Sequence, residues 1–239
     1  EGENQPVVSQ DVVVAVVPIR PGDSSVTLRI AGRSVLDGTI RALRAVEQIG
    51  PIVLAVQGIR NTDCLAVIEN PRGLGISVTA SWGSRWEAIR SALAMAGSGS
   101  TVLLHNPDRP LVSASGIVQL LAALRDVPAV VTAMPVHGSI KRVVDGRILA
   151  TVPRDLLHVV QSPWVFQREP LERALRAAIA ERWPASQELE LVRLAGIPVR
   201  VAEGHRFNVP ISSPADARFA EMAVRRRLVS VPGLVTTPV

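Results

Sequence analysis

The chain has 239 residues, of which 47% are hydrophobic and 20% charged, so it can bury a sizeable core and is not a disordered protein. Its longest apolar stretches, such as residues 12–19, are far shorter than the roughly 20 residues that a membrane-spanning helix needs. The single cysteine, Cys64, excludes an internal disulfide framework and a multi-cysteine zinc site, and it favours a reducing cytoplasm as the location.

The charge of the chain favours an anionic ligand over nucleic acid. The net charge is +5, and Lys141 is the only lysine, so every other basic residue is arginine. The arginine guanidinium is planar and permanently charged, which suits it to phosphate. Nucleic-acid binding is disfavoured because the chain has four tryptophans, three phenylalanines, no tyrosine and no basic run longer than residues 225–227. Four scattered histidines argue against a histidine-built metal site.

Short β-branched runs alternate with helical patterns, which predicts βαβ units and a mostly parallel sheet with flanking helices. In chain order we predict a strand at 11–17, a helix at 36–46, strands at 52–56 and 76–79, a helix at 86–93, a strand at 101–105, a helix at 117–124, a strand at 129–134, a helix at 171–180, a strand at 197–202 and a helix at 215–227. Gly50 and Pro51 are expected to stop the first helix. Ser213 and Pro214 are typical of a helix start, because a hydroxyl caps the first turn and proline has no amide to satisfy.

One segment breaks this alternation. Residues 139–144 and 147–152 are two strand-like runs joined by Asp145 and Gly146, a pair that favours a two-residue hairpin turn because both positions need positive φ. The hairpin is either a minor edge element or a dimerisation arm. We expect a single domain over residues 11–228, with the arm at about 136–158 and loose tails at 1–10 and 229–239. No basic-then-apolar leader precedes Asp11, and a chain that begins at Glu1 without Met is expected to be trimmed or numbered from a longer one.

Ligands of open α/β sheets bind beyond the carboxyl ends of the strands, so the turns there are the places to search. The turn after the first strand, residues 17–25, is a poor phosphate cradle because only Gly22 supplies backbone freedom and Pro21 has no N–H. The turn at residues 105–110 holds Asp108 and Arg109, which either orient a ribose or a phosphate or simply pair with each other. The turn after the hairpin contains Arg154 and residues 161–164.

These motifs, in this order, resemble the 2-C-methyl-D-erythritol 4-phosphate cytidylyltransferases of the non-mevalonate isoprenoid pathway, from about Val12 to Arg227. The segments that carry the resemblance are 32–36 ("GGKTVL" in the family), 85–93 ("RxxSVxxAL"), 105–110 ("HDAARP"), 139–141 ("DTIK"), 161–163 ("QTPQ") and 203–212 ("EGxxxNxKIT"). The resemblance implies a Rossmann-like nucleotidyltransferase sheet, a hairpin arm that pairs two subunits into a homodimer, and CTP and a sugar phosphate as candidate ligands.

The resemblance also implies roles for individual residues. Family members transfer CMP from CTP to the phosphate of methylerythritol phosphate, with Mg²⁺ as cofactor. Positions that match the nucleotide site are Pro18, Gly22, Gly83, Arg85, Asn106, Asp108 and Arg109. Positions that match the substrate-phosphate site are Ser139, Lys141, Arg154 and Ser162, of which Arg154 would reach the ligand of the partner subunit. Arg20 is the candidate catalytic cation, close in sequence to a missing lysine.

The chain departs from the family where the reaction needs positive charge. The family's two lysines align with Ser25 and Pro210, its metal-binding Asp aligns with Asn106, and a base-binding hydroxyl aligns with Ala88. Losing one group that stabilises a developing oxyanion typically costs a factor of about 10² to 10³ in rate, so these changes together predict a loss of at least about 10⁴. We therefore assign no metal site.

Two functions stay open at this point. The first is a catalytically impaired family member that binds a nucleotide or a phosphorylated ligand. The second is an active cytidylyltransferase, or a nucleotidyltransferase of changed substrate, in which Arg20, Arg109 and Arg206 supply the missing cations and Mg²⁺ is required.

Overall fold

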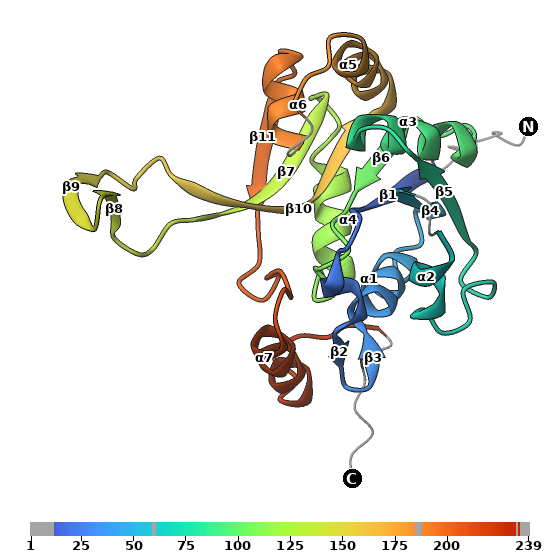
Figure 1. Cartoon of the computed structure of the whole chain (residues 1–239), viewed down its shortest axis with the longest axis horizontal. Coiled ribbons are helices and arrows are strands. Elements are labelled where there is room, and N and C mark those ends of the chain that lie inside the picture. The colour runs from blue at the N-terminus through green and yellow to red at the C-terminus, as the bar shows by residue number, and fades with distance from the viewer. Residues whose placement is uncertain (1–11, 59–60, 185–187, 233, 235–239) are drawn as a thin grey trace, which may run out of the picture.

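The computed structural model describes residues 12–58, 61–184, 188–232 and 234. Its centre is a seven-stranded sheet in the order β11-β7-β10-β6-β1-β4-β5 (Figure 1). These strands are β1 (Val13–Ile19), β4 (Ile49–Gln57), β5 (Ile76–Ser81), β6 (Thr101–Leu104), β7 (Ala129–Pro135), β10 (His158–Gln167) and β11 (Val199–Glu203). Only β10 runs antiparallel to its neighbours, so the predicted mostly parallel α/β fold is confirmed.

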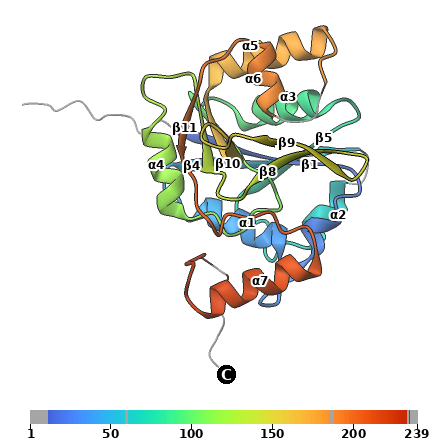
Figure 2. The same cartoon turned by 90° about the vertical axis from the view of Figure 1, so that its left-hand side faces the viewer.

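Helices cover both faces of the sheet. They are α1 (Val35–Arg44), α2 (Asn61–Ala66), α3 (Arg85–Ala96), α4 (Ala114–Ala122), α5 (Arg168–Ala180), α6 (Glu188–Leu194) and α7 (Pro214–Arg225). In β1, Ala15 and Val17 belong to the core cluster that also contains side chains of α1, α4 and α7, and Val14 and Val16 belong to the cluster that contains side chains of α3, α5 and α6 on the other face (Figure 2). The uninterrupted apolar sequence of β1 follows from this burial on both sides.

The prediction missed one central strand, β10. Residues 161–164 were interpreted as a turn because Gln161, Ser162 and Pro163 interrupt the apolar run. The pairing of β10 with β7 shifts register between Val160 and Trp164, and such an irregularity accommodates a proline inside a sheet. The short helices α2 and α6 were not predicted either. Gly50 and Pro51 lie within β4 and do not terminate the preceding helix, which ends at Arg44.

The segment after α7 differs in part from the predicted loose tail. Val231 and Leu234 are 4% and 1% exposed and belong to the core cluster that contains α1. Their apolar side chains gain more by burial there than the chain loses by being ordered. Residues 1–11 and 235–239 lie outside the described residues.

Two small hairpins complete the fold. One is β2 (Arg29–Ile30) with β3 (Arg33–Ser34), next to the 3₁₀ turn η1 (Ser24–Thr27). The other is β8 (Ile140–Val144) with β9 (Arg147–Val152), which projects from the body as an arm (Figure 1). Asp145 and Gly146 have φ of 48° and 75°, so the predicted two-residue turn is confirmed. Among the described helices, none combines the length and the apolar character needed to cross a membrane.

Candidate functional site

A pocket of about 540 Å³ opens at the carboxyl ends of β1 and β4. Its walls include Ile19, Val56 and Gln57 from the strand ends, and Arg20, Gly22 and Asp23 from the turn after β1. This is the edge at which ligands of parallel sheets bind, and the volume is that of a small-molecule site. Pro18, predicted to bind nucleotide, is buried inside β1, where it pairs with Ala55 of β4.

The turn after β1, residues 20–25, folds back on itself. The Asp23 carboxylate caps η1: its Oδ1 accepts the Ser25 N–H at 3.1 Å and also the Ser25 hydroxyl. Ser25, at the position of the family's first lysine, is therefore buried and bonded within the turn. Arg20 is exposed on the rim of the pocket, and Gly22 takes a φ of 69° that requires glycine-like freedom.

The second turn at this edge is the 105–109 loop, defined as the residues that follow β6. The His105 N–H donates to the Val16 carbonyl at 3.0 Å, which fixes the start of the loop beside β1. His105 Nε2 lies 3.0 Å from the Arg109 carbonyl oxygen, which can only accept, so Nε2 carries the proton. Nδ1 then accepts from the Ser162 hydroxyl at 3.0 Å, and Ser162 Oγ accepts the Asn106 N–H at 3.1 Å.

The His105 imidazole is neutral in this arrangement. Burial lowers the pKa of His105 to about 4, because a charged ring would lose its hydration. The backbone carbonyl of Arg109 favours the charged form and the Arg109 guanidinium opposes it, but burial is the largest influence. His105 and Ser162 therefore join both ends of the 105–109 loop to β10 without a net charge.

A third segment, residues 203–211, closes over the same loop. Gln161 of β10 donates to the His205 carbonyl at 3.0 Å and accepts the His205 N–H at 3.1 Å. The buried Asn208 donates to the Ser162 carbonyl at 2.7 Å, and the Arg109 guanidinium donates to the Asn208 carbonyl. The polar interruption of β10 thus serves as the point where the two loops are joined.

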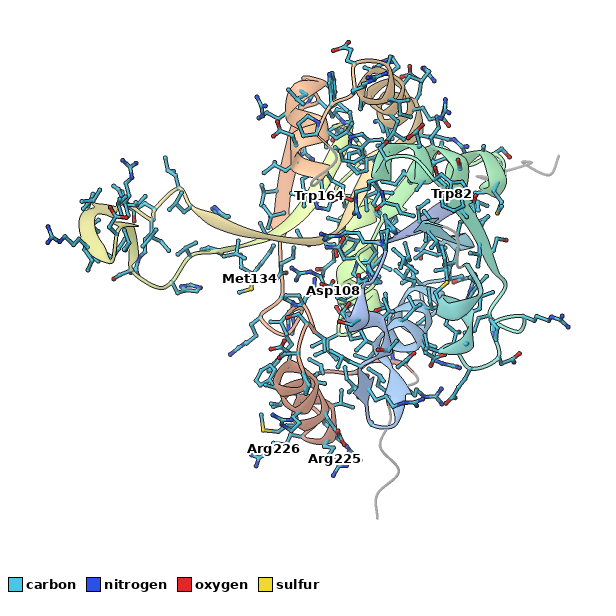
Figure 3. The ribbon with its side chains drawn as sticks, viewed as in Figure 1. Trp82, Asp108, Met134, Trp164, Arg225 and Arg226 are labelled. Atoms are coloured by element: carbon cyan, nitrogen blue, oxygen red, sulfur yellow. The ribbon has the colours of Figure 1, made fainter. Side chains whose placement is uncertain are left out.

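Asp108 and Arg109 are adjacent in sequence but do not form an ion pair. Among the described residues, the ion pairs with an N–O distance within 4.0 Å do not include one between the Arg109 guanidinium and the Asp108 carboxylate. Asp108 Oδ1 and Arg109 Nε are buried without a hydrogen-bond partner. Burial raises the pKa of the Asp108 carboxyl, an effect that the charge of Arg109 opposes and the charge of Asp23 reinforces. Figure 3 shows Asp108 next to the segment that follows β1.

The turn after β5 carries the predicted Gly83 and Arg85. Ser84 and Glu87 form a capping box at the start of α3, and the Ser81 carbonyl accepts the N–H of Gly58, which lines the pocket. The Arg85 side chain is only 6% exposed, and its guanidinium donates to the Glu188 carboxylate of α6, through Nε at 3.1 Å and through Nη2. The guanidinium of Arg85 is thus engaged within the fold, away from the solvent.

The predicted substrate-phosphate residues fall into two places. Ser139, Lys141 and Arg154 lie on the exposed arm, where Lys141 donates to the Thr151 hydroxyl at 2.7 Å and Arg154 to the His137 carbonyl. Ser162 lies in the sheet, 3% exposed, and its single hydroxyl hydrogen is used by His105. Within one chain the arm carries its three residues away from the pocket (Figure 1).

Magnesium is the cofactor that the family resemblance implies, and the residues present do not fit it well. Asn106 offers a neutral amide where a hard dication prefers a carboxylate. Asp108 supplies one carboxylate, but Arg109 and Arg20 act on it as positive charges. In the described part of the chain, no group of three His, Cys, Asp or Glu side chains is placed to hold a metal ion.

Several residues of this site were not singled out from the sequence: His105, Gln161, Asn208 and Asp23. All four are polar residues within or next to the motifs, which is the signal that could have drawn attention to them. Their partners lie far along the chain, as with His105 and Ser162, which are 57 positions apart.

The sequence and the fold are similar to those of known proteins. The family model described as 2-C-methyl-D-erythritol 4-phosphate cytidylyltransferase matches residues 19–226. The chain belongs to this family. It is 34% identical over 203 residues to the cytidylyltransferase of Symbiobacterium thermophilum, covering 84% of this chain and 85% of that protein. It is 31% identical over 206 residues to that of Synechococcus elongatus, covering 84% and 88%.

The crystal structure of the Thermus thermophilus cytidylyltransferase is also similar. It superposes with a TM-score of 0.75 at 27% identity, covering 88% of this chain and 98% of that chain. The predicted resemblance to the cytidylyltransferases of isoprenoid biosynthesis is thereby confirmed.

Proposed function

We propose that this chain is a nucleotide-binding member of the cytidylyltransferase family in which transfer of the cytidylyl group is strongly impaired. The pocket at the ends of β1 and β4 supports the binding part of this proposal. The impairment is supported by the charges around it, because in-line attack at phosphorus needs fixed positive groups near the phosphoryl oxygens.

The observation that carries the proposal is the state of Ser25. A flexible lysine at this position would extend a cation toward the phosphates, whereas Ser25 is 8% exposed and bonded to the Asp23 carboxylate. The Asp23 carboxylate therefore closes this turn, whereas family members have a lysine cation at the position of Ser25. Pro210 stands in place of the family's second lysine, and Asn106 stands in place of its metal-binding Asp.

The test is pyrophosphate release from CTP in the presence of methylerythritol phosphate and Mg²⁺, with the Thermus thermophilus cytidylyltransferase as the comparison. We expect a rate at least about 10⁴-fold lower for this chain. Turnover within tenfold of the comparison enzyme, abolished by Arg20→Ala, would contradict the proposal.

A second candidate function is an active transferase with arginines in place of lysines. One observation favours it: Arg109 has a buried Nε without a partner, and Arg20 stands on the pocket rim. Both guanidiniums are thus able to bind a ligand. If this candidate is right, Arg20→Ala and Arg109→Ala each lower the rate of pyrophosphate release, whereas Arg173→Ala, on the exposed side of α5, leaves it unchanged.

We also propose a homodimer formed through the arm. Val143, Val144, Ile148 and Leu149 are 49–67% exposed, and Leu156 is 92% exposed, so the arm presents an apolar surface to solvent. A partner would cover this surface, and Ser139, Lys141 and Arg154 would then approach the partner's pocket. Light scattering should give a dimer mass that Ile148→Asp with Leu149→Asp reduces to a monomer; an unchanged mass argues against the arm.

A further inference from the structure

We propose that the pocket favours a nucleoside monophosphate over a nucleoside triphosphate, because the Asp23 carboxylate lies on the pocket wall and the Asp108 carboxylate lies on the loop that emerges beside it. The inference rests on the proposed nucleotide binding and names the class of ligand that this same pocket accepts. It concerns binding alone.

The charges that line the pocket are balanced. Among the described residues around it, the charged side chains are Arg20 and Asp23, and the remainder are apolar or neutral groups such as Val26, Val56 and Gln57. Arg109 and Asp108 add one further charge of each sign from the neighbouring loop. The described charges therefore sum to zero, which suits a ligand with one phosphate group better than one that carries about four negative charges.

Asp108 lies on the loop beside the pocket, where its charge would affect the two ligands differently. It follows β6, which lies next to β1 in the sheet, so the 105–109 loop and the turn after β1 emerge side by side. The Asp108 carbonyl accepts the Ile211 N–H at 2.8 Å and the Pro107 carbonyl accepts the Thr39 hydroxyl at 2.8 Å, so the backbone here is fixed. Asp108 Oδ1 is buried without a hydrogen-bond partner, so no side chain donates to this oxygen.

The cations present are only partly available to a polyphosphate. Arg109 already donates through one nitrogen to the Asn208 carbonyl, and its charge also interacts with that of the Asp108 carboxylate. Arg20 is exposed, where solvent and salt weaken its attraction for phosphate. One guanidinium can bind one phosphate group. No further cationic side chain in the described lining would neutralise the charge of a second and a third phosphate group.

The experiment is calorimetric titration of the full chain with CMP and with CTP in EDTA, so that no metal neutralises the phosphates. The variant Asp108→Asn removes the charge and keeps the shape of the side chain. The control Asp126→Asn makes the same change of charge at an exposed residue before β7, at the other end of the sheet. Circular dichroism checks folding, and Asp108→Ala, the alanine found at this position in the family motif, is the second variant.

We expect CMP to bind the wild type at least as tightly as CTP does. Asp108→Asn should raise CTP affinity about tenfold while CMP affinity changes less than about threefold, and Asp126→Asn should leave both unchanged. A wild type that binds CTP more than tenfold tighter than CMP, or an Asp108 variant with an unchanged CTP to CMP ratio, would overturn the inference and leave nucleotide binding intact. Absence of binding by either nucleotide would overturn both the inference and the proposed function.

Discussion

Two loops meet at the carboxyl edge of the sheet, and they are held in different ways. The 105–109 loop is joined to β10 and to residues 205–211 by side-chain hydrogen bonds from His105, Ser162, Arg109 and Asn208. The turn at residues 20–25 is bonded mainly to itself, with Arg20 exposed. The scaffold around the pocket is therefore strongly fixed, whereas the groups that we propose to contact phosphate are few and near solvent.

The largest expected effect comes from removing the imidazole that fixes the first loop. His105→Ala should lower the free energy of unfolding by about 3 kcal/mol, because it empties a buried site and leaves the Ser162 hydroxyl and the Arg109 carbonyl without partners. Urea unfolding measures the change. A loss under about 1 kcal/mol would show that the 105–109 loop does not depend on this ring.

Acid should weaken the same loop through the same residue. The folded pKa of His105, about 4, lies below the 6.5 of an unfolded histidine, so between these values the unfolded chain binds more protons than the folded one. The contribution of His105 is complete above pH 6.5 and is lost as pH falls toward 4, with a slope of up to about 1.4 kcal/mol per pH unit. Unfolding measured from pH 7 to 4.5 should show a shallower slope in His105→Gln than in the wild type; equal slopes would contradict a buried neutral ring.

Ser162 should matter for stability through its hydroxyl. Ser162→Ala removes the acceptor of the Asn106 N–H and the donor to His105, at a cost of about 1–3 kcal/mol. Ser162→Thr keeps the hydroxyl, so thermal unfolding should place it nearer the wild type than the alanine variant. Equal melting temperatures for Ser162→Ala and Ser162→Thr would show that the hydroxyl does not contribute to stability.

The smallest effect is expected in the other loop. Arg20→Ala should change the free energy of unfolding by no more than about 0.5 kcal/mol, because Arg20 is exposed and substitutions at such positions seldom do more. It should nevertheless weaken nucleotide binding in the same calorimetric titration, since Arg20 is on the pocket rim. A large loss of stability in Arg20→Ala would contradict the claim that the turn at residues 20–25 depends less on its side chains than the 105–109 loop does.

The sequence predicts the sheet well where burial on both faces produces continuous apolar runs, as in β1 and β7. It fails at β10, because Gln161 to Pro163 look like a turn when the register shift against β7 and the bonds of Gln161 to His205 are unknown. Val231 shows the same limit: it lies in a short segment interrupted by Pro232 and Gly233, without helical or strand periodicity, so the local sequence gives no sign of the core that it joins.

The sequence predicted candidate site residues but not the contacts that they make. Ser162 was expected to bind phosphate, and its hydroxyl is hydrogen-bonded to His105. Asp108 and Arg109 were candidates for a local pair, but they form no ion pair within 4.0 Å among the described residues, and each keeps a buried atom without a hydrogen-bond partner. Such roles depend on contacts made across the fold, which local sequence does not encode.

The most direct test is a chemical-quench experiment in which the protein is in excess over labelled CTP, with saturating methylerythritol phosphate and Mg²⁺. Under these conditions every bound nucleotide has one opportunity to react. We predict that the label is recovered almost entirely as CTP after minutes. Conversion of one equivalent to the cytidylyl product within seconds would contradict impaired transfer.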